Sequence, residues 1–242
     1  MRHYAGQVWF LPPEFEEGGD NKRRPHLLLT TREDDESGVF SYASTKSTEA
    51  RLGASVVTVD PAASPDANTG FEKSTFIYPS RLVPVLPGDF GQLAGRLVHE
   101  MPRVRAGLRT ALGLGSGTTA GFGAAAFSWR GRIVRFRPHI EESLGYAYGI
   151  VLTEANYSRK RRYQTIVPMD RLECFEPEDG DIILATLPWF SRVDPTMTAA
   201  LIGIGDVQSI FHPKDIARWT GAVIDNGTLG EIEARLKELF EL

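Results

Sequence analysis

KRRPHLLLTT, residues 22–31, places three cations and a proline directly before an apolar run of β-type residues. The run predicts a strand over residues 26–31, because apolar and β-branched side chains bounded by turn residues favour extended structure. A solvated loop end is a common place for such charge. The rest of the chain decides whether these cations have a function.

The composition is that of an ordinary soluble globular protein, with 42% hydrophobic and 24% charged residues in a chain of 242. This length fits one large domain or two of about 120 residues. The net charge is −4, so we expect any contact with RNA or DNA to be local rather than spread over the molecule.

Cys174 is the single cysteine, which excludes an internal disulfide, a cysteine-based metal site and a CxxC redox pair. A reducing cytoplasm fits this pattern best. No run of residues approaches the roughly 18 apolar positions that a membrane span needs. We therefore expect neither a signal peptide nor a transmembrane segment, no membrane partner, and a cytoplasmic location.

A segment rich in glycine and other small residues, residues 113–128, divides the sequence nearly in half. Its composition is typical of a flexible connection. A nucleotide-binding glycine loop must follow a strand and open a helix, whereas residues 104–112 before this segment predict a helix. We therefore predict a domain over residues 1–115, a linker over 116–128 and a second domain over 129–242.

The two halves share short matches that occur in the same order along the chain. The matches pair residues 6–10 with 131–135, 28–30 with 151–153, and 76–82 with 210–216. The simplest account is a duplicated domain whose second copy carries an insertion of about ten residues before its end.

Short β-rich segments separated by Gly, Pro and Asp clusters indicate a small barrel or a tightly curled sheet. In the first half they cover residues 7–10, 26–31, 39–44, 54–59 and 75–78. Helices are expected late in each half. One would begin at Asp89 and carry Phe90, Leu93 and Leu97; another would follow Pro102 and carry Val104, Leu108 and Leu112; the last would open with a capping box of Thr228 and Glu231.

The order of these motifs resembles the MazF/PemK family of toxin endoribonucleases, over most of residues 5–115. The series comprises the glycine-led first strand, a loop rich in Glu and Gly over residues 12–22, Arg24-Pro25 before the second strand, the hydroxyl cluster at residues 42–47, Gly70-Phe71, Ser74-Thr75-Phe76, Arg81-Leu82 and Leu112-Gly113. No single piece is distinctive, and the ordered series carries the resemblance.

The resemblance implies an SH3-like barrel that dimerises and cleaves single-stranded RNA without a metal or another cofactor. It also implies an antitoxin protein or peptide as a partner. The expected fold class is mainly β with C-terminal helices (α+β), as two SH3-like (CcdB/PemK-like) barrels in tandem that form an intramolecular pseudo-dimer. Whether two chains assemble further stays open.

By the same resemblance, the catalytic residues are Arg24 and Thr45. RNA cleavage without metal uses the 2′-hydroxyl to attack the adjacent phosphate, so negative charge develops on the phosphoryl oxygens. An arginine suits that charge because it is always protonated and offers a forked set of donors. Thr45 could orient the phosphate or relay a proton if Arg24 lies close by.

Other polar residues around Arg24 are candidates for catalysis or substrate binding. His26 would share a strand face with Arg24, and a neutral imidazole there could accept or return a proton near pH 7. A packing histidine is the alternative. The further candidates for catalysis or substrate binding are Ser44, Lys46 and Ser47, and those for RNA contact are Lys22, Arg23, Tyr42 and Phe71. Solvated cations and core aromatics are the competing interpretations.

The second half departs from this pattern. Ala147-Tyr148 takes the place of Arg24-Pro25, and Asp170 lies near the position of the threonine. A carboxylate there would repel a phosphate, so we expect no catalysis in this half. The basic run at residues 159–162 and the apolar pair at residues 189–190 are candidate contact sites, with a solvated loop and core packing as the respective alternatives.

Two other functions remain open at this stage. One is a non-catalytic module of the same fold that binds an antitoxin-like peptide, another protein or nucleic acid. The acidic balance of the chain and its degenerate second half favour this. The other is inhibition of a topoisomerase by binding, as in the related fold of CcdB.

Overall fold

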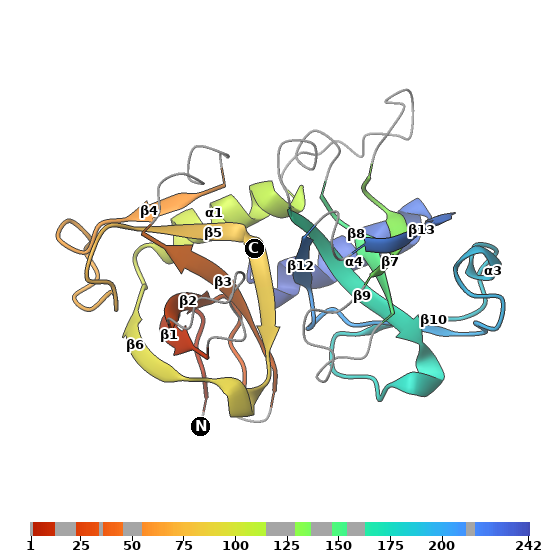
Figure 1. Ribbon diagram of the computed structural model, residues 1–242, viewed down its shortest axis with the longest axis horizontal. Coiled ribbons are helices and arrows are strands. Elements are labelled where there is room, and N and C mark those ends of the chain that lie inside the picture. The colour runs from red at the N-terminus through yellow and green to blue at the C-terminus, as the bar shows by residue number, and fades with distance from the viewer. Residues whose placement is uncertain are drawn as a thin grey trace. The chain divides into compact units, whose positions relative to one another are not determined.

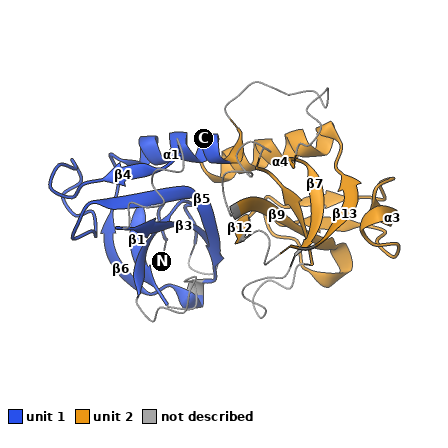
Figure 2. Ribbon diagram, turned by 45° about the horizontal axis from the view of Figure 1, so that its top comes forward, with its two compact units in different colours: residues 1–111, 242 blue, residues 112–241 orange. Residues whose placement is uncertain are grey.

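The computed structural model describes residues 2–12, 23–33, 36–45, 55–114, 129–136, 147–153, 163–211 and 216–242. The chain divides into two compact units, Met1–Ala111 with Leu242, and Leu112–Glu241 (Figure 2). The segment predicted as a linker, residues 116–128, lies outside the described residues. Each unit is built mainly of β-strands that form one curled antiparallel sheet with a few helices (Figure 1).

The sheet of unit 1 has six strands in the order β4-β5-β3-β2-β1-β6. All of its neighbouring strands run antiparallel. The elements are β1 (Gln7–Leu11), β2 (Arg24–Leu28), β3 (Gly38–Ser44), β4 (Val57–Val59), β5 (Thr75–Val85), the 3-10 helix η3 (Pro87–Asp89), β6 (Gln92–Arg96) and α1 (Met101–Leu112). Strand β2 begins at Arg24, so this cation belongs to the strand itself.

The core of unit 1 includes a cluster on one side of the sheet and the buried stripe of α1. Leu11, Leu28, Phe40 and Val85 form a fully buried cluster, because strands β1, β2, β3 and β5 each turn apolar side chains to the same side. The predicted stripe on α1 is confirmed, since Val104, Leu108 and Leu112 are all buried. Helix α1 runs beside β4 and β5 (Figure 1). Gly107 permits this approach, because a Cβ there would lie 2.4 Å from the carbonyl oxygen of Ser55.

The helix predicted from Asp89 is wrong, because β6 forms there and pairs with β1. The spacing of Phe90, Leu93 and Leu97 imitates a helical stripe, yet Leu93 is 48% exposed. Two glycines explain the strand. A Cβ on Gly91 would lie 1.9 Å from the carbonyl oxygen of Phe10, and a Cβ on Gly95 would lie 2.2 Å from the amide of Gly70. Glycine also disfavours a helix interior.

The sheet of unit 2 has seven strands, in the order β10-β11-β9-β8-β7-β13, with β12 also paired to β9. Its elements are β7 (Arg132–Phe136), β8 (Tyr148–Val151), β9 (Tyr163–Arg171), the 3-10 helix η4 (Leu172–Cys174), β10 (Ile182–Leu184), α3 (Phe190–Val193), β11 (Ala200–Ile202), β12 (Gln208–Phe211), β13 (Ile216–Val223) and α4 (Asn226–Leu239). Trp189 and Phe190 are buried, as their core interpretation requires.

The two sheets have the same strand order, with β11 and β12 together in the place that β5 takes in unit 1. Equivalent backbone hydrogen bonds join the first two strands of each sheet. The amide of Gly6 donates to the carbonyl of Leu28, and that of Gly131 donates to Val151, each at 2.8 Å. Two of the predicted sequence matches, 6–10 with 131–135 and 28–30 with 151–153, fall at these equivalent places.

The third predicted match, 76–82 with 210–216, is wrong. Phe76 lies opposite Ser44 near the end of β3. Ile210 lies opposite Gln164 near the start of β9. The strand that pairs with the end of β9 is β11, residues 200–202. The match failed because it rested on one Pro flanked by apolar residues, a pattern that strand pairing does not depend on.

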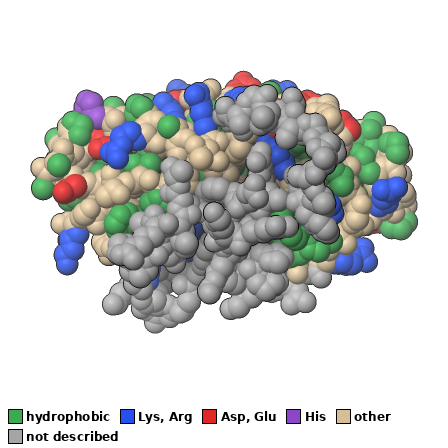
Figure 3. Space-filling view, turned by 90° about the horizontal axis from the view of Figure 1, so that it is seen from above, with side chains coloured by type: hydrophobic (Ala, Val, Ile, Leu, Met, Phe, Trp, Pro, Cys, Tyr) green, Lys and Arg blue, Asp and Glu red, His purple; other side chains and the backbone are tan. Residues whose placement is uncertain are grey.

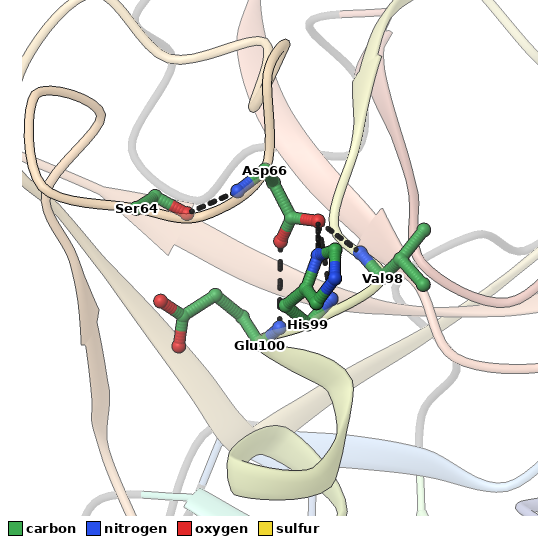
Figure 4. A network of polar contacts seen from close by, with 5 residues as sticks. All are labelled: Ser64, Asp66, Val98, His99 and Glu100. Atoms are coloured by element: carbon green, nitrogen blue, oxygen red, sulfur yellow. Dashed lines mark hydrogen bonds and ion pairs between the residues drawn. The ribbon is translucent and has the colours of Figure 1, made fainter.

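An aspartate caps the chain at the start of each long helix. Asp225 precedes α4 and accepts a hydrogen bond from the amide of Thr228 at 2.9 Å, so the helix starts before the predicted cap at Thr228. Asp66 comes from a distant loop and caps the three residues directly before α1 (Figure 4). Its carboxylate accepts from the amides of Val98 at 2.9 Å, His99 at 3.1 Å and Glu100 at 3.4 Å, and from His99 Nδ1 at 2.9 Å.

Within the described residues, the helices are too short or too polar to cross a bilayer.

Candidate functional site

A row of ring side chains crosses strands β1, β2, β3 and β5 of unit 1. The register places Trp9 opposite His26, His26 opposite Tyr42, and Tyr42 opposite Tyr78. Residues directly opposite in antiparallel strands point to the same side of the sheet. The rings of His26 and Tyr42 accordingly meet edge to face with centroids 5.6 Å apart, and those of Tyr42 and Tyr78 lie 5.9 Å apart.

Arg24 lies on the same side of the sheet, two residues before His26 in β2. Its Nη1 donates a hydrogen bond of 2.5 Å to the hydroxyl oxygen of Tyr42. The guanidinium carbon stands 6.0 Å from the centroid of the Tyr42 ring, at the rim that carries the hydroxyl. Arg24 is half-buried. The tyrosine therefore fixes the orientation of this cation at the sheet surface.

A second cation, Arg81, reaches the same ring from an irregularity in β5. Tyr42 pairs with Tyr78 while Ser41 pairs with Leu82, so residues 79–81 bulge out of the ladder. A bulge re-aims side chains, and the guanidinium carbon of Arg81 lies 3.9 Å from the centroid of Tyr42. It also lies 5.9 Å from the centroid of Tyr78. One phenol ring thus holds two arginines, one at its hydroxyl and one against its face.

His26 is fully buried beneath these groups. Burial lowers its pKa to about 4; a hydrogen bond with the Arg24 carbonyl opposes this, and the charges of Arg81 and Arg24 lower the pKa further. The imidazole is therefore neutral near pH 7. Nδ1 lies 3.1 Å from the Arg24 carbonyl oxygen, while Nε2 has no hydrogen-bond partner among the described residues. His26 shares the strand face of Arg24, as the alternation along the strand predicted, but its burial favours packing over proton transfer to a substrate.

The hydroxyl candidates lie at the end of β3. Thr45 follows the strand and is exposed, whereas Ser44, its last residue, is buried. The register that places His26 opposite Tyr42, continued by two residues, brings Ser44 opposite Arg24. Thr45 comes one residue later. Of the other cationic and hydroxyl candidates, Arg23 is exposed, and Lys22, Lys46 and Ser47 lie outside the described residues.

Tyr42 and Phe71 were expected to offer rings on which bases stack. The structure instead leaves only 8% of Tyr42 and 9% of Phe71 exposed. One face of the Tyr42 ring is also covered by Arg81. A base needs an open ring face to stack on. This burial weighs against stacking, and RNA contact by Tyr42 and Phe71 stays a prediction. In this structure Tyr42 contacts the two arginines.

The equivalent row in unit 2 lacks all of these side chains. Gly149 pairs with Pro168, and Gly203 donates its amide to the Pro168 carbonyl at 3.0 Å, so the row reads Gly149, Pro168, Gly203 where unit 1 has His26, Tyr42, Tyr78. Ala147 stands in the place of Arg24, as predicted.

Asp170 was predicted near the position of Thr45 and lies one residue away from it. In the register of β8 and β9, Asp170 is the counterpart of Ser44, and Arg171 that of Thr45. The amide of Ala147 donates to Asp170 Oδ2 at 2.7 Å. A carboxylate therefore stands across from the position where unit 1 has its cation.

One face of the molecule shows how charged side chains are spread over its described residues. In Figure 3 the Lys and Arg side chains of the coloured surface stand singly or in small groups among hydrophobic and other side chains. This agrees with a net charge of −4 and with a local site. Within the described ranges, no group of three His, Cys, Asp or Glu side chains is placed to hold a metal ion.

Sequence reasoning selected Arg24 as a candidate and missed the contacts of Tyr42 with Arg24 and Arg81. A usable signal was present. Proline removes a ladder hydrogen bond, so Pro79 inside a β-rich run predicts a bulge. The sequence Tyr78-Pro79-Ser80-Arg81 would then place a cation where the chain leaves the ladder.

No protein-family model matches the sequence, and no curated protein matches it at a significant level. Solved structures that the chain resembles are MazF-type endoribonuclease toxins of mycobacteria. One is an endoribonuclease from a mycobacterial species, 16% identical, covering 46% of this chain and 91% of that chain with a TM-score of 0.35. A second is a mycobacterial endoribonuclease in complex with its cognate antitoxin, 18% identical, covering 46% and 96% with a TM-score of 0.36. A third is the Mycobacterium tuberculosis toxin MazF-mt6, 20% identical, covering 43% and 94% with a TM-score of 0.33.

Proposed function

We propose that the chain is a toxin-type endoribonuclease that cleaves single-stranded RNA at the arginine cluster of unit 1. The observation that carries the proposal is the fixed, half-buried guanidinium of Arg24, held by the Tyr42 hydroxyl beside a second arginine. In a chain of net charge −4, this cluster is a built site for an anion. The motif series around Arg24 supports a phosphodiester of RNA as that anion.

Arg24 would act on the charge that develops during cleavage. The 2′-oxygen forms a bond to phosphorus, the bond from phosphorus to the 5′-oxygen of the next nucleotide breaks, and that oxygen takes up a proton as the 2′-hydroxyl loses one. The products are a 2′,3′-cyclic phosphate and a 5′-hydroxyl. The non-bridging oxygens gain negative charge in the transition state, and a preorganised forked donor stabilises them.

A hydroxyl at the end of β3 would position the phosphate against Arg24. Thr45 is the residue that the family pattern selects, and it is exposed, as a substrate contact requires. Ser44 is the residue that the strand register brings opposite Arg24. We keep Thr45 as the proposed catalytic hydroxyl and Ser44 as its neighbour in substrate binding.

Cleavage of a mixed-sequence single-stranded RNA by the purified chain tests the proposal. The new 5′-hydroxyl ends are labelled by a polynucleotide kinase and counted, once with chelator and once with Mg²⁺. We expect Arg24→Ala to lower the rate by about 10²–10³, the usual effect of removing one donor from an oxyanion site. Arg24→Lys keeps the charge without the fork, so we expect it to recover only part of the rate.

Arg135→Ala is the matched control, because it removes an exposed arginine from a strand of unit 2 with the same change in net charge. We expect it to cleave at the wild-type rate. Cleavage by Arg24→Ala at the wild-type rate would remove Arg24 from the mechanism. Cleavage that requires Mg²⁺ would overturn the metal-independent route.

A non-catalytic module that binds nucleic acid or a peptide is the second candidate. The burial of His26 favours it, because the imidazole that could move a proton near pH 7 is neutral and covered. The same kinase assay separates the two functions. RNA that is retained on the protein in a filter-binding assay, with no new 5′-hydroxyl ends, identifies the binding module.

Further features follow from the family resemblance and stay predictions. They are the SH3-like class of each sheet, an internal pseudo-dimer of duplicated units, an antitoxin partner, a cytoplasmic location and a possible homodimer. Expression in growing bacteria tests their common premise. Growth arrest that Arg24→Ala abolishes would support a toxin, and harmless accumulation of the wild-type chain would oppose it.

A further inference from the structure

Arg81 is a second cation that the proposed chemistry at Arg24 does not use. Its guanidinium lies over the ring of Tyr42, with Cζ 3.9 Å from the ring centroid. Because Arg24 stands 6.0 Å from the same centroid, the two guanidinium carbons cannot be farther apart than the sum of these distances. We infer that Arg81 and Tyr42 form a second anion subsite that binds the phosphate next to the scissile one. This inference rests on the proposed function of unit 1 as a site for single-stranded RNA.

The stacked geometry suits a phosphate subsite. Stacking engages the flat face of the guanidinium through a cation–π interaction. The N–H donors of arginine lie in the plane of the group and form a fork that matches a phosphate. The ring of Tyr42 therefore limits the rotation of Arg81, and a contact with a ring face uses none of the N–H donors of the guanidinium. A cation that is already oriented loses less conformational entropy when a ligand binds.

Arg81 and Arg24 act on the same local environment. The charge of each lowers the pKa of the buried His26, whose ring meets that of Tyr42. The two cations therefore belong to one site.

Unit 2 shows that the fold does not require Arg81. In unit 1 three residues separate Tyr78 from Leu82, which lies opposite Ser41. In unit 2 three residues separate Gly203 from Val207, which the register of β9 and β12 brings opposite Val167. The residue before Val207 is Asp206. The same bulge therefore carries an arginine in one unit and an aspartate in the other.

Successive phosphates of one strand are the ligand class that suits two neighbouring forks. Each phosphate that a protein neutralises on a single strand adds about −0.7 to the slope of log K against log salt. A base-reading role fits Arg81 less well, because its flat face is already used by Tyr42. Arg81 would thus act on affinity and register along the strand, and Arg24 on the phosphate that reacts.

The test uses RNA trinucleotides that carry 2′-O-methyl groups and hydroxyl ends, so that they contain two phosphodiesters and cannot be cleaved. In two analogues, one linkage or the other is a neutral methylphosphonate. We expect the wild-type chain to bind each analogue about tenfold more weakly than the parent, in isothermal titration calorimetry at low salt. In Arg81→Ala, neutralising one of the linkages should no longer weaken binding. In Arg24→Ala, the other linkage should lose its effect.

Arg96→Ala is the control, because Arg96 is an exposed arginine of unit 1 that stands 5.4 Å from another ring, that of Tyr4. Both linkages should keep their effects in this variant. Arg81→Gln, with a side chain of similar length, repeats the measurement if Arg81→Ala unfolds. A purely structural role of Arg81 would weaken binding of all three ligands by the same factor and would not remove the effect of a single linkage.

If neutralising either linkage still weakens binding in full in Arg81→Ala and Arg81→Gln, the subsite is overturned. The same holds if the wild-type chain binds an analogue with one neutral linkage as tightly as the parent. Cleavage is scored separately. Arg24-dependent cleavage without the linkage pattern leaves the proposed function and removes the subsite. The linkage pattern without cleavage leaves the subsite and removes the nuclease.

Discussion

The two units have the same order of strands but carry different side chains at equivalent positions on the sheet. In unit 1 the cluster of Arg24, Tyr42 and Arg81 crosses β2, β3 and β5. In unit 2 the equivalent positions hold Ala147, Pro168 and Asp206. Since unit 2 forms its sheet without any of these groups, the cluster is not a condition for folding. Its presence in unit 1 therefore calls for a function.

The charge on this face also differs in sign between the units. Ser44 and Arg81 of unit 1 correspond to Asp170 and Asp206 of unit 2. A phosphate that approached the equivalent place on unit 2 would meet carboxylates and no arginine at the position of Arg24. The comparison therefore predicts that anion binding and cleavage are confined to unit 1.

The largest effect on stability should come from acid, through His26 of unit 1. The folded pKa of His26 is about 4, below the ordinary value of 6.5. Between these values the unfolded chain binds more protons than the folded one, so the free energy of unfolding falls as pH drops from 6.5 to 4. At about 1.36 kcal/mol per pKa unit, the loss approaches about 3 kcal/mol.

Hydrogen exchange read by mass spectrometry, corrected for intrinsic rates, resolves this loss by strand. Peptides of β2 should lose protection over this pH range, whereas those of β8, which carries Gly149 instead of the histidine, should not lose it for this reason. His26→Phe keeps a ring against Tyr42 and should flatten the pH dependence. Equal loss in β2 of the wild type and the variant would contradict the assignment to His26.

The two helix caps should differ by a smaller amount. Asp66→Ala leaves the amides of Val98, His99 and Glu100 without their acceptor, and we expect unit 1 to lose about 1–3 kcal/mol in free energy of unfolding. Asp225→Ala removes a local cap and should cost about 0.5–2 kcal/mol. Denaturant titrations of both variants measure the difference.

The cap at Asp66 also has a pH signature. Burial raises the pKa of this carboxyl, but the hydrogen bonds from His99, Val98 and Glu100 outweigh burial, so the pKa is lowered. Its contribution is therefore complete above the ordinary carboxyl value and is lost as pH falls through the lowered one. Asp66→Asn should remove that part of the acid dependence. An Asp66→Asn chain with an unchanged acid limb below about pH 4 would refute this role.

The smallest expected effect is on the cleavage rate, and it distinguishes the roles of Thr45 and Ser44. Thr45→Val should lower cleavage about two- to tenfold, the effect of losing a hydrogen bond of about 0.5–1.5 kcal/mol. Ser44→Ala should have a smaller effect if Ser44 only assists binding. The kinase assay on both variants decides, and a larger loss in Ser44→Ala would move the catalytic role to the residue that the strand register favours.

Much of this architecture could be predicted from the sequence. The pattern of β-type residues predicted β1 and β3 to within one residue at each end. The apolar stripe at Val104, Leu108 and Leu112 predicted α1. The segment from Phe90 to Leu97 was misread, because helical spacing outweighed two glycines whose role depends on a close approach of backbone. Contacts of that kind join residues far apart in the chain, so a local pattern does not reveal them.

The candidate site could be predicted only in part from the sequence, for the same reason. Arg24 could be identified because it begins a strand within a recognisable motif order. The packing of Arg81 on Tyr42 depends on a bulge that shifts the register between β3 and β5. A shift of register is a property of the pair of strands. Either strand read alone gives no sign of it, apart from the proline at residue 79.

The glycine that opens each unit has a practical consequence. Gly6 and Gly131 both have positive φ, +93° and +77°. At Gly6 any Cβ would lie 2.3 Å from the Leu97 carbonyl oxygen. This glycine also accepts the Leu97 amide at 2.7 Å, as Gly131 accepts that of Ile224 at 2.9 Å. A glycine one residue before the first strand is thus a landmark by which genome searches can locate the start of such units where overall similarity has faded.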